Sequence, residues 1–124
     1  MKKILLVDDS PTVVTTAYDE LDERGYMVEV AYNGQLALKR LTEFGDDLPD
    51  LIVMDIEMPK MRGDEAAKVI RETPAWSHLP IIALTGVAPE NLGPAAQLFN
   101  NYLIKPFGFD QMLELVERMI GAPD

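Results

Sequence analysis

Cysteine is absent from this chain of 124 residues. The protein therefore has no disulfide, no thiol nucleophile and no thiolate to offer a metal. Long apolar runs are missing too, since Asp8 and Asp9 end the first run, Ile4–Val7, after only four residues. That run is too short for a secretory signal, and no stretch approaches the roughly 18 apolar residues of a membrane span. We expect a soluble cytoplasmic protein without a membrane association.

Basic residues are scarce: 11 Lys and Arg stand against 21 Asp and Glu, which gives a formal net charge of −10. Contacts with phosphate backbones require clustered Lys or Arg, so direct binding of nucleic acid is not expected. The acidity either keeps the surface soluble or matches the basic surface of a partner, and the sequence leaves both readings open.

Short apolar runs alternate with amphipathic stretches about five times along the chain. The apolar runs have the length and composition of strands; they are Ile4–Val7, Met27–Ala31, Leu51–Met54, Ile81–Leu84 and Tyr102–Ile104. Helical stretches begin near Ser10-Pro11, Asn33-Gly34, Gly63 and Phe109. Strands that alternate with helices predict an α/β fold with a parallel sheet and helices on both faces.

Right-handed crossovers and short connections favour a doubly wound five-stranded sheet in the order 2-1-3-4-5. The second run alternates, with Val28 and Val30 against Glu29, and the fifth run is short, so these two suit the sheet edges. No linker, repeat or low-complexity segment interrupts the pattern, which predicts a single domain over residues 1–124.

Polar side chains stand at the carboxyl ends of four predicted strands. Asp8 and Asp9 follow the first strand, Asp55 the third, Thr85 the fourth and Lys105 the fifth. Each has an ordinary explanation by itself, since an aspartate can cap a helix, a threonine can end a strand and a lysine can lie on the surface. In a doubly wound sheet, however, these ends meet at one edge, where ligands bind. Together the five side chains predict a site.

Three carboxylates at close quarters repel one another, and removing them from water costs several kcal/mol each without partners. A hard divalent cation with oxygen ligands resolves the repulsion, and Mg²⁺ suits a site that keeps several waters. The same cation neutralises the oxygens of an incoming phosphoryl group. A carboxylate nucleophile in this setting can accept phosphate as an acyl phosphate.

Four segments, in order and correctly spaced, resemble the receiver domain of bacterial response regulators, which has a flavodoxin-like, CheY-like fold. The resemblance covers essentially the whole chain. The segments are Ile-Leu-Leu-Val-Asp8-Asp9-Ser10, Asp50-Leu-Ile-Val-Met-Asp55-Ile-Glu-Met-Pro59-Lys-Met-Arg-Gly63, Pro80-Ile-Ile-Ala-Leu-Thr85 and Tyr102-Leu-Ile-Lys105-Pro106-Phe107.

The resemblance implies that Asp55 is the phosphoacceptor. It implies that Asp9 and Asp55 bind Mg²⁺ directly together with the backbone carbonyl of Glu57, while Asp8 acts mainly through a metal-bound water. It implies that Lys105 pairs with the phosphoryl group. The donor would be a histidine kinase or a histidine phosphotransferase, because the one histidine, His78, lies in a loop away from the strand ends.

The resemblance also implies a conformational switch. Thr85 would move to hydrogen-bond the phosphorylated aspartate and Tyr102 would swing inward behind it. The bond before Pro106 is expected to be cis, and Gly63 is expected where the chain turns into its third helix. The protein would assist its own phosphorylation and dephosphorylation without being a turnover enzyme, and Glu57 and Val87 occupy positions that tune the lifetime of the phosphoryl group in the family.

The stretch before Tyr102 departs from the family. Pro89, Gly93 and Pro94 crowd it, and proline inside a helix costs about 3 kcal/mol. We expect a short or distorted fourth helix that begins at or after Pro94 and covers Ala95–Asn100. The family uses its fourth helix, fifth strand and fifth helix for output, so a downstream protein target and a homodimer through that face both stay open.

Two other functions are compatible with parts of this pattern. A Mg²⁺-dependent phosphatase of the haloacid-dehalogenase type also forms an aspartyl phosphate, but its nucleophile sits on the first strand in an Asp-x-Asp pattern, whereas Asp8 and Asp9 are adjacent. A receiver-like module that signals without phosphate usually loses one of the acidic residues, the threonine or the lysine. This chain keeps all of them.

Overall fold

The computed structural model describes residues 1–124 and contains one five-stranded sheet. The strands are β1 (Lys3–Val7), β2 (Met27–Ala31), β3 (Leu51–Asp55), β4 (Ile81–Thr85) and β5 (Asn101–Ile104). All neighbouring strands are parallel, in the order β2-β1-β3-β4-β5, which confirms the predicted sheet. The α-helices are α1 (Pro11–Arg24), α2 (Gly34–Phe44), α3 (Gly63–Glu72) and α4 (Phe109–Ile120).

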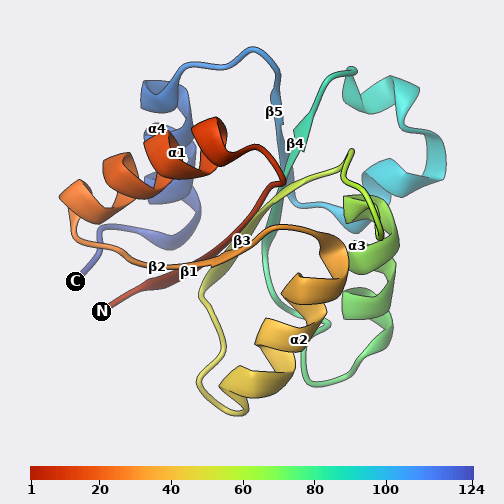
Figure 1. Cartoon of the computed structure of the whole chain (residues 1–124), viewed down its shortest axis with the longest axis horizontal. Helices are drawn as coiled ribbons and strands as arrows, with labels where there is room; N and C mark the ends of the chain where they lie inside the picture. The colour runs from red at the N-terminus through yellow and green to blue at the C-terminus, as the bar shows by residue number, and fades with distance from the viewer.

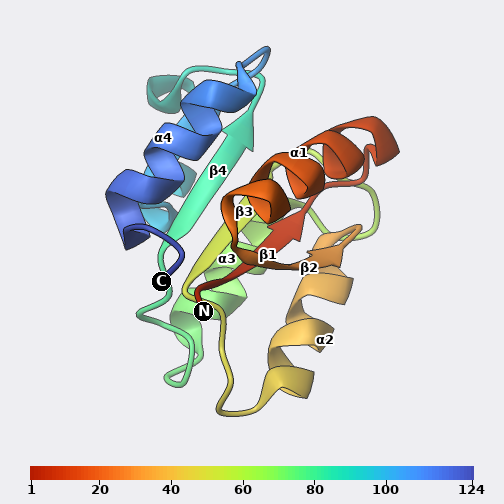
Figure 2. The same cartoon turned by 90° about the vertical axis from the view of Figure 1, so that its left-hand side faces the viewer.

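The helices form two layers around the sheet, with α1 and α4 on one face and α2 and α3 on the other (Figures 1 and 2). Successive residues of a strand point to opposite faces, so Ile4 and Leu6 pack in the α1–α4 core while Leu5 and Val7 pack in the α2–α3 core. Because both faces are covered, the central strands β1, β3 and β4 are buried along their whole length.

The predicted starts of the first two helices are confirmed by their caps. The Ser10 hydroxyl accepts a hydrogen bond from the Val13 N–H, and Pro11 occupies the first turn of α1, where its missing N–H has no cost. Gly25, with φ at 102°, ends that helix in the left-handed conformation. The Asn33 Oδ1 atom accepts from the Leu36 N–H at 2.9 Å and starts α2.

No helix combines the length and the apolar character needed to cross a bilayer.

Between β4 and β5 the chain forms two short 3-10 helices, η1 (Pro89–Asn91) and η2 (Gly93–Leu98), in place of an α-helix. The short, distorted character of this region is therefore confirmed. The predicted start was wrong, since helical structure begins at Pro89 and not at or after Pro94. A proline is compatible with the first position of a single 3-10 turn, because the N–H it lacks would have no partner there.

Candidate functional site

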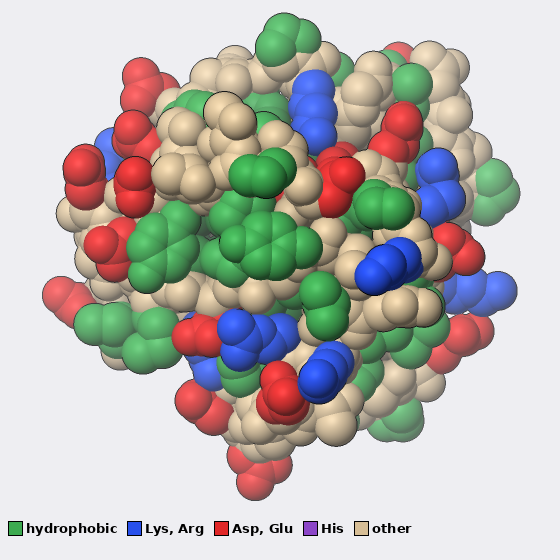
Figure 3. Space-filling view, viewed as in Figure 1, with side chains coloured by type: hydrophobic (Ala, Val, Ile, Leu, Met, Phe, Trp, Pro, Cys, Tyr) green, Lys and Arg blue, Asp and Glu red, His purple; other side chains and the backbone are tan.

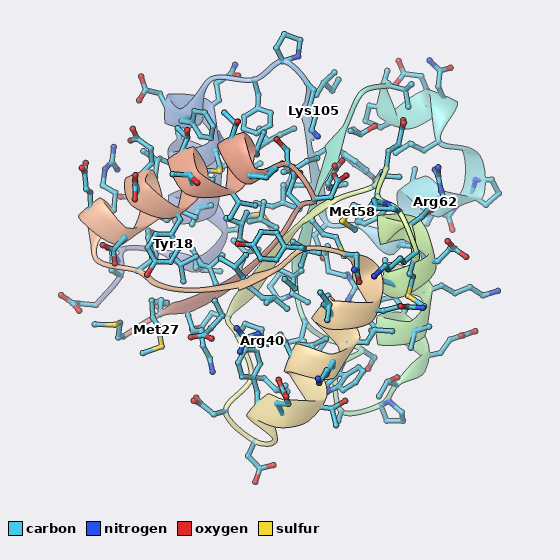
Figure 4. The ribbon with its side chains drawn as sticks, viewed as in Figure 1. Tyr18, Met27, Arg40, Met58, Arg62 and Lys105 are labelled. Atoms are coloured by element: carbon cyan, nitrogen blue, oxygen red, sulfur yellow. The ribbon has the colours of Figure 1, made fainter.

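The polar residues predicted from the strand ends meet at one edge of the sheet. Asp8 and Asp9 follow β1, Asp55 is the last residue of β3, and the order of strands reverses between these two neighbours. The Lys105 side chain extends from the end of β5 toward the same place (Figure 4). The fold thus brings together four of the predicted residues from three strands.

The three aspartates form one compact group. Asp8, Asp9 and Asp55 each contribute a carboxylate oxygen, and these atoms all lie within 4.8 Å of one another. Asp8 has no exposed surface and Asp55 is 4% exposed, whereas Asp9 faces solvent. Two of the three carboxylates are therefore buried and that of Asp9 is open to solvent, so a cation can reach the group from that side.

Lys105 is the cation that the structure supplies to this group. Its Nζ lies 3.2 Å from Oδ2 of Asp55 and 3.7 Å from Oδ2 of Asp8. Burial by itself lowers the pKa of Lys105, but attraction to Asp8 and Asp55 outweighs burial and leaves this pKa above its ordinary value. The lysine is therefore charged at neutral pH.

One lysine does not satisfy the carboxylates. Burial raises the pKa of Asp55 above its ordinary value of 3.8, the charge of Asp8 raises it further, and Lys105 offsets part of this rise. Burial likewise raises the pKa of Asp8. The Oδ2 atom of Asp8 is buried without a hydrogen-bond partner, because Lys105 is too distant at 3.7 Å. Unpartnered oxygens that face two further carboxylates fit a hard divalent cation such as Mg²⁺.

Local backbone geometry holds two of these aspartates in place. The Ser10 N–H donates to Oδ1 of Asp8 at 2.8 Å, which fixes one oxygen and leaves the other facing the cluster. The Glu57 N–H approaches Oδ1 of Asp55 at 3.4 Å. Gly63 closes the loop that follows β3 by donating its N–H to the Ile56 carbonyl at 2.8 Å.

The remaining predicted residues do not reach the cluster. The Thr85 hydroxyl donates to the Val87 carbonyl and accepts from the Val87 N–H, both at 3.0 Å, so it faces its own loop. The Tyr102 hydroxyl donates to the Ala96 carbonyl in η2. The Glu57 side chain is exposed and its carboxylate is not part of the acidic group.

The sequence model of the response regulator receiver domain matches residues 4–117, which is most of the chain. The chain belongs to this family. It is a receiver domain of two-component signalling, and its fold and acidic cluster agree with that assignment.

Curated relatives extend the match. An uncharacterized 14.6 kDa protein of Leptolyngbya boryana is 39% identical over 93% of this chain and 87% of its own length. The response regulator MprA of Mycobacterium ulcerans is 32% identical over 95% of this chain but only 50% of its own length. The receiver domain thus spans about half of some relatives and most of others.

Solved structures show the same fold. The chemotaxis response regulator CheY4 of Vibrio cholerae is 33% identical, with a TM-score of 0.84 over 96% of this chain and 98% of its own. TrrA of Thermotoga maritima in complex with Mg²⁺–BeF is 35% identical, with a TM-score of 0.83 over 96% of this chain and 99% of its own. A structure of histidine kinase ThkA with TrrA gives 36% identity and a TM-score of 0.82, covering 97% and 99%.

Two further features of this receiver domain bear on the sequence analysis. The Lys105–Pro106 peptide bond is cis, as expected. The hydrogen bond from the Ser10 N–H to Oδ1 of Asp8 was not predicted. An aspartate two residues before a serine in a turn is a detectable signal, since aspartate side chains accept from the backbone two residues on.

Proposed function

We propose that this receiver domain is a phosphorylation switch that accepts a phosphoryl group on Asp55. The observation that carries the proposal is the setting of Asp55. Its carboxylate lies at the base of the acidic group, is 4% exposed, and has the Lys105 ammonium 3.2 Å away. A carboxylate held beside a fixed positive charge is a suitable nucleophile for phosphorus, because that charge also attracts the phosphoryl oxygens.

The donor in this proposal is a phosphohistidine of a histidine kinase or a histidine phosphotransferase. An oxygen of Asp55 forms a bond to phosphorus, the nitrogen–phosphorus bond of the donor breaks, and the imidazole leaves with the electron pair. The products are an acyl phosphate on Asp55 and a free histidine, so the step needs no oxidant or reductant. The solved complex of TrrA with the histidine kinase ThkA, to which this chain is similar, supports a partner of that class.

The metal in the proposal is Mg²⁺, held by Asp9 and Asp55 directly, with Asp8 acting mainly through a metal-bound water and the Glu57 backbone carbonyl as a further ligand. When bound, the ion neutralises the negative charge that gathers on the phosphoryl oxygens. The unpartnered Oδ2 of Asp8 and the Mg²⁺–BeF complex of the similar protein TrrA support this set.

Thr85 and Tyr102 form the switch in this proposal. Phosphorylation adds about one negative charge and three strong acceptor oxygens. The Thr85 hydroxyl then stops donating to the Val87 carbonyl and donates to a phosphoryl oxygen, and Tyr102 moves inward behind it. Shifting a population from 1:99 to 99:1 requires roughly 5.5 kcal/mol. Two or three charge-assisted hydrogen bonds of about 1.5–3 kcal/mol each supply a free energy of that size.

Incubation with acetyl phosphate and Mg²⁺, followed by peptide mass spectrometry, tests the proposal. We expect one hydroxylamine-sensitive phosphoryl group on Asp55 in the wild type and none in Asp55→Asn. Asp46→Asn serves as the matched control, because Asp46 is an exposed aspartate in the loop after α2 and should leave labelling unchanged. An unlabelled wild type, or label that persists in Asp55→Asn, contradicts the proposal.

Beryllofluoride separates this function from a phosphate-independent module. We expect a Mg²⁺-dependent beryllofluoride complex that shifts the NMR resonances of Thr85 and Tyr102. A domain that binds neither ion with Asp55 intact signals without phosphate. Continuous release of phosphate from a phosphate ester would instead identify a phosphatase.

A further inference from the structure

One edge of the sheet has an exposed apolar surface that the phosphorylation site does not use. Two adjoining hollows, of 430 Å³ and 290 Å³, run along β2, which is the outermost strand. Eight large apolar side chains of the protein are exposed, and five of them line these hollows. They are Met1, Tyr18, Met27, Tyr32 and Leu36. We call this surface the β2 edge: strand β2 with these five residues and with Lys39, Arg40 and Glu43 of α2.

The figures place the β2 edge on one continuous face. Apolar side chains gather on the left and centre of the space-filling view, over α1 and β2 (Figure 3). Tyr18, Met27 and Arg40 lie along the length of β2, on α1, on the strand itself and on α2 (Figure 4). Contiguous apolar surface on a small protein commonly marks an interaction site.

The backbone of β2 also has unused hydrogen-bonding groups. The Met27 N–H donates to Lys2 and the Ala31 carbonyl accepts from Asp8, so these residues face β1. Backbone groups of alternate residues point to opposite sides of a strand, and Val28 and Val30 therefore turn theirs toward the open edge. The one group engaged there is the Val30 carbonyl, which accepts from Arg40 Nε at 3.4 Å, a long bond that is readily exchanged.

Charge on the β2 edge is balanced, unlike the rest of the molecule. The net charge of the chain is −10, and α1 alone carries four acidic residues against one arginine. The two hollows along β2 contain three acidic and two basic side chains, so this is a face on which two copies can approach with little repulsion. Lys39 and Glu43, one helical turn apart, are both exposed and form no ion pair within the chain.

We propose that the β2 edge binds a second copy of this chain, with the two β2 strands antiparallel about a two-fold axis. An interface of this symmetry presents the same patch twice and must be self-complementary. Two antiparallel α2 helices place Lys39 opposite Glu43 of the second copy and Glu43 opposite its Lys39. A different protein whose surface carries charge of one sign would attract either Lys39 or Glu43, but not both. The proposal is independent of phosphoryl transfer at Asp55.

The test measures mass against concentration by sedimentation velocity and native mass spectrometry, beginning with the wild-type monomer of 13.8 kDa. We expect a reversible dimer that Met27→Lys weakens at least tenfold. Ile104→Lys is the matched control on the opposite edge strand, because Ile104 is 47% exposed and Met27 is 43% exposed. A wild type that stays monomeric at its highest soluble concentration overturns the proposal, and so does a dimer that Ile104→Lys abolishes and Met27→Lys preserves.

Exchanging charges on α2 provides a second test, because a mixture of two variants can restore the dimer only if each variant is folded. Lys39→Glu and Glu43→Lys, each alone, bring like charges together twice across the two-fold axis and should each weaken the dimer by about tenfold, a loss of about 1.4 kcal/mol. An equimolar mixture of the two variants restores both attractions. We expect heterodimers to dominate that mixture. Equal weakness in the mixture and in the separate variants overturns the antiparallel arrangement.

Discussion

At the scale of single residues, Gly63 shows how closely the loop after β3 packs against Asp55. A Cβ atom at this position would lie 2.1 Å from the backbone oxygen of Asp55 and 2.9 Å from Cα of Ile56. Both of these atoms belong to the backbone, so neither can move aside as the end of a flexible side chain would. The start of α3 and the end of β3 therefore approach each other more closely than any other residue permits.

We predict that Gly63→Ala lowers the free energy of unfolding by at least about 2–3 kcal/mol, because the backbone around Asp55 must shift. Urea denaturation provides the measurement. Gly86→Ala is the control, since a Cβ there meets nothing within 4 Å and its φ is not in the left-handed region; it should change stability by less than about 1 kcal/mol. Equal losses in the two variants would show that the close approach is not the cause.

At the scale of elements, the segment from Gly86 to Asn100 is held mainly by contacts with other parts of the chain. The Arg71 guanidinium, on α3, donates to four acceptors: the carbonyls of Leu98, Ser77 and Leu79 at 3.0, 3.1 and 2.7 Å, and Oδ1 of Asn100 at 2.8 Å. The same Asn100 oxygen accepts from the Ile81 N–H at 2.8 Å. One arginine thus connects η2, the start of β4 and α3.

We predict that Arg71→Gln destabilises the protein by about 2–3 kcal/mol, because it leaves several partly buried acceptors without a donor. Hydrogen exchange should accelerate most at residues 93–100, where η2 loses its attachment to α3. Lys68→Gln, an exposed lysine one turn earlier on α3, is expected to change neither quantity. Uniform acceleration across the whole sheet would contradict a local role for Arg71.

Much of this element-scale structure follows from the sequence. Ser10 and Asn33 start helices because their side chains accept hydrogen bonds from backbone N–H groups three residues later. That signal is local in the sequence. The site residues were predictable for a related reason, since parallel strands carry Asp9, Asp55 and Lys105 to one edge. The Arg71 contacts were not predictable, because they join residues up to 29 positions apart and three of the four acceptors are backbone carbonyls.

The direction of the Thr85 hydroxyl was equally hidden. Its position at the end of β4 follows from the apolar run, but its rotamer depends on the conformation of the loop containing Val87. That loop carries no regular pattern between Gly86 and Pro89 in the sequence. The sequence therefore located Thr85 at the end of β4 but left the direction of its hydroxyl undetermined.

At the scale of the whole molecule, the acidic cluster links stability to pH. Burial raises the pKa of both Asp8 and Asp55 above the ordinary value of 3.8, so the folded protein binds protons more tightly than the unfolded chain. The contribution of these groups to stability is therefore greatest below about pH 4 and is lost as the pH rises through the raised pKa values. In metal-free protein at neutral pH, the carboxylates of Asp8 and Asp55 repel each other with no bound cation to reduce the repulsion.

We predict that Asp55→Asn is more stable than the metal-free wild type at pH 7, by about 1–2 kcal/mol. The advantage should vanish at acid pH, where Asp55 of the wild type is protonated. Adding Mg²⁺ should stabilise the wild type more than the variant, because binding to the folded state alone raises its stability. Thermal denaturation across a pH series, with chelator and with Mg²⁺, measures each of these differences.

The two 3-10 turns between β4 and β5 have a consequence for how such proteins diversify. The acidic cluster is built from strand ends, whereas residues 86–100 form a separate segment, held to the rest of the protein by Arg71 and by the packing of Phe99 in the α2–α3 core. Changes of length or sequence in that stretch leave the carboxylates where they are. The segment between β4 and β5 can therefore change between related proteins while the carboxylates of the cluster keep their arrangement.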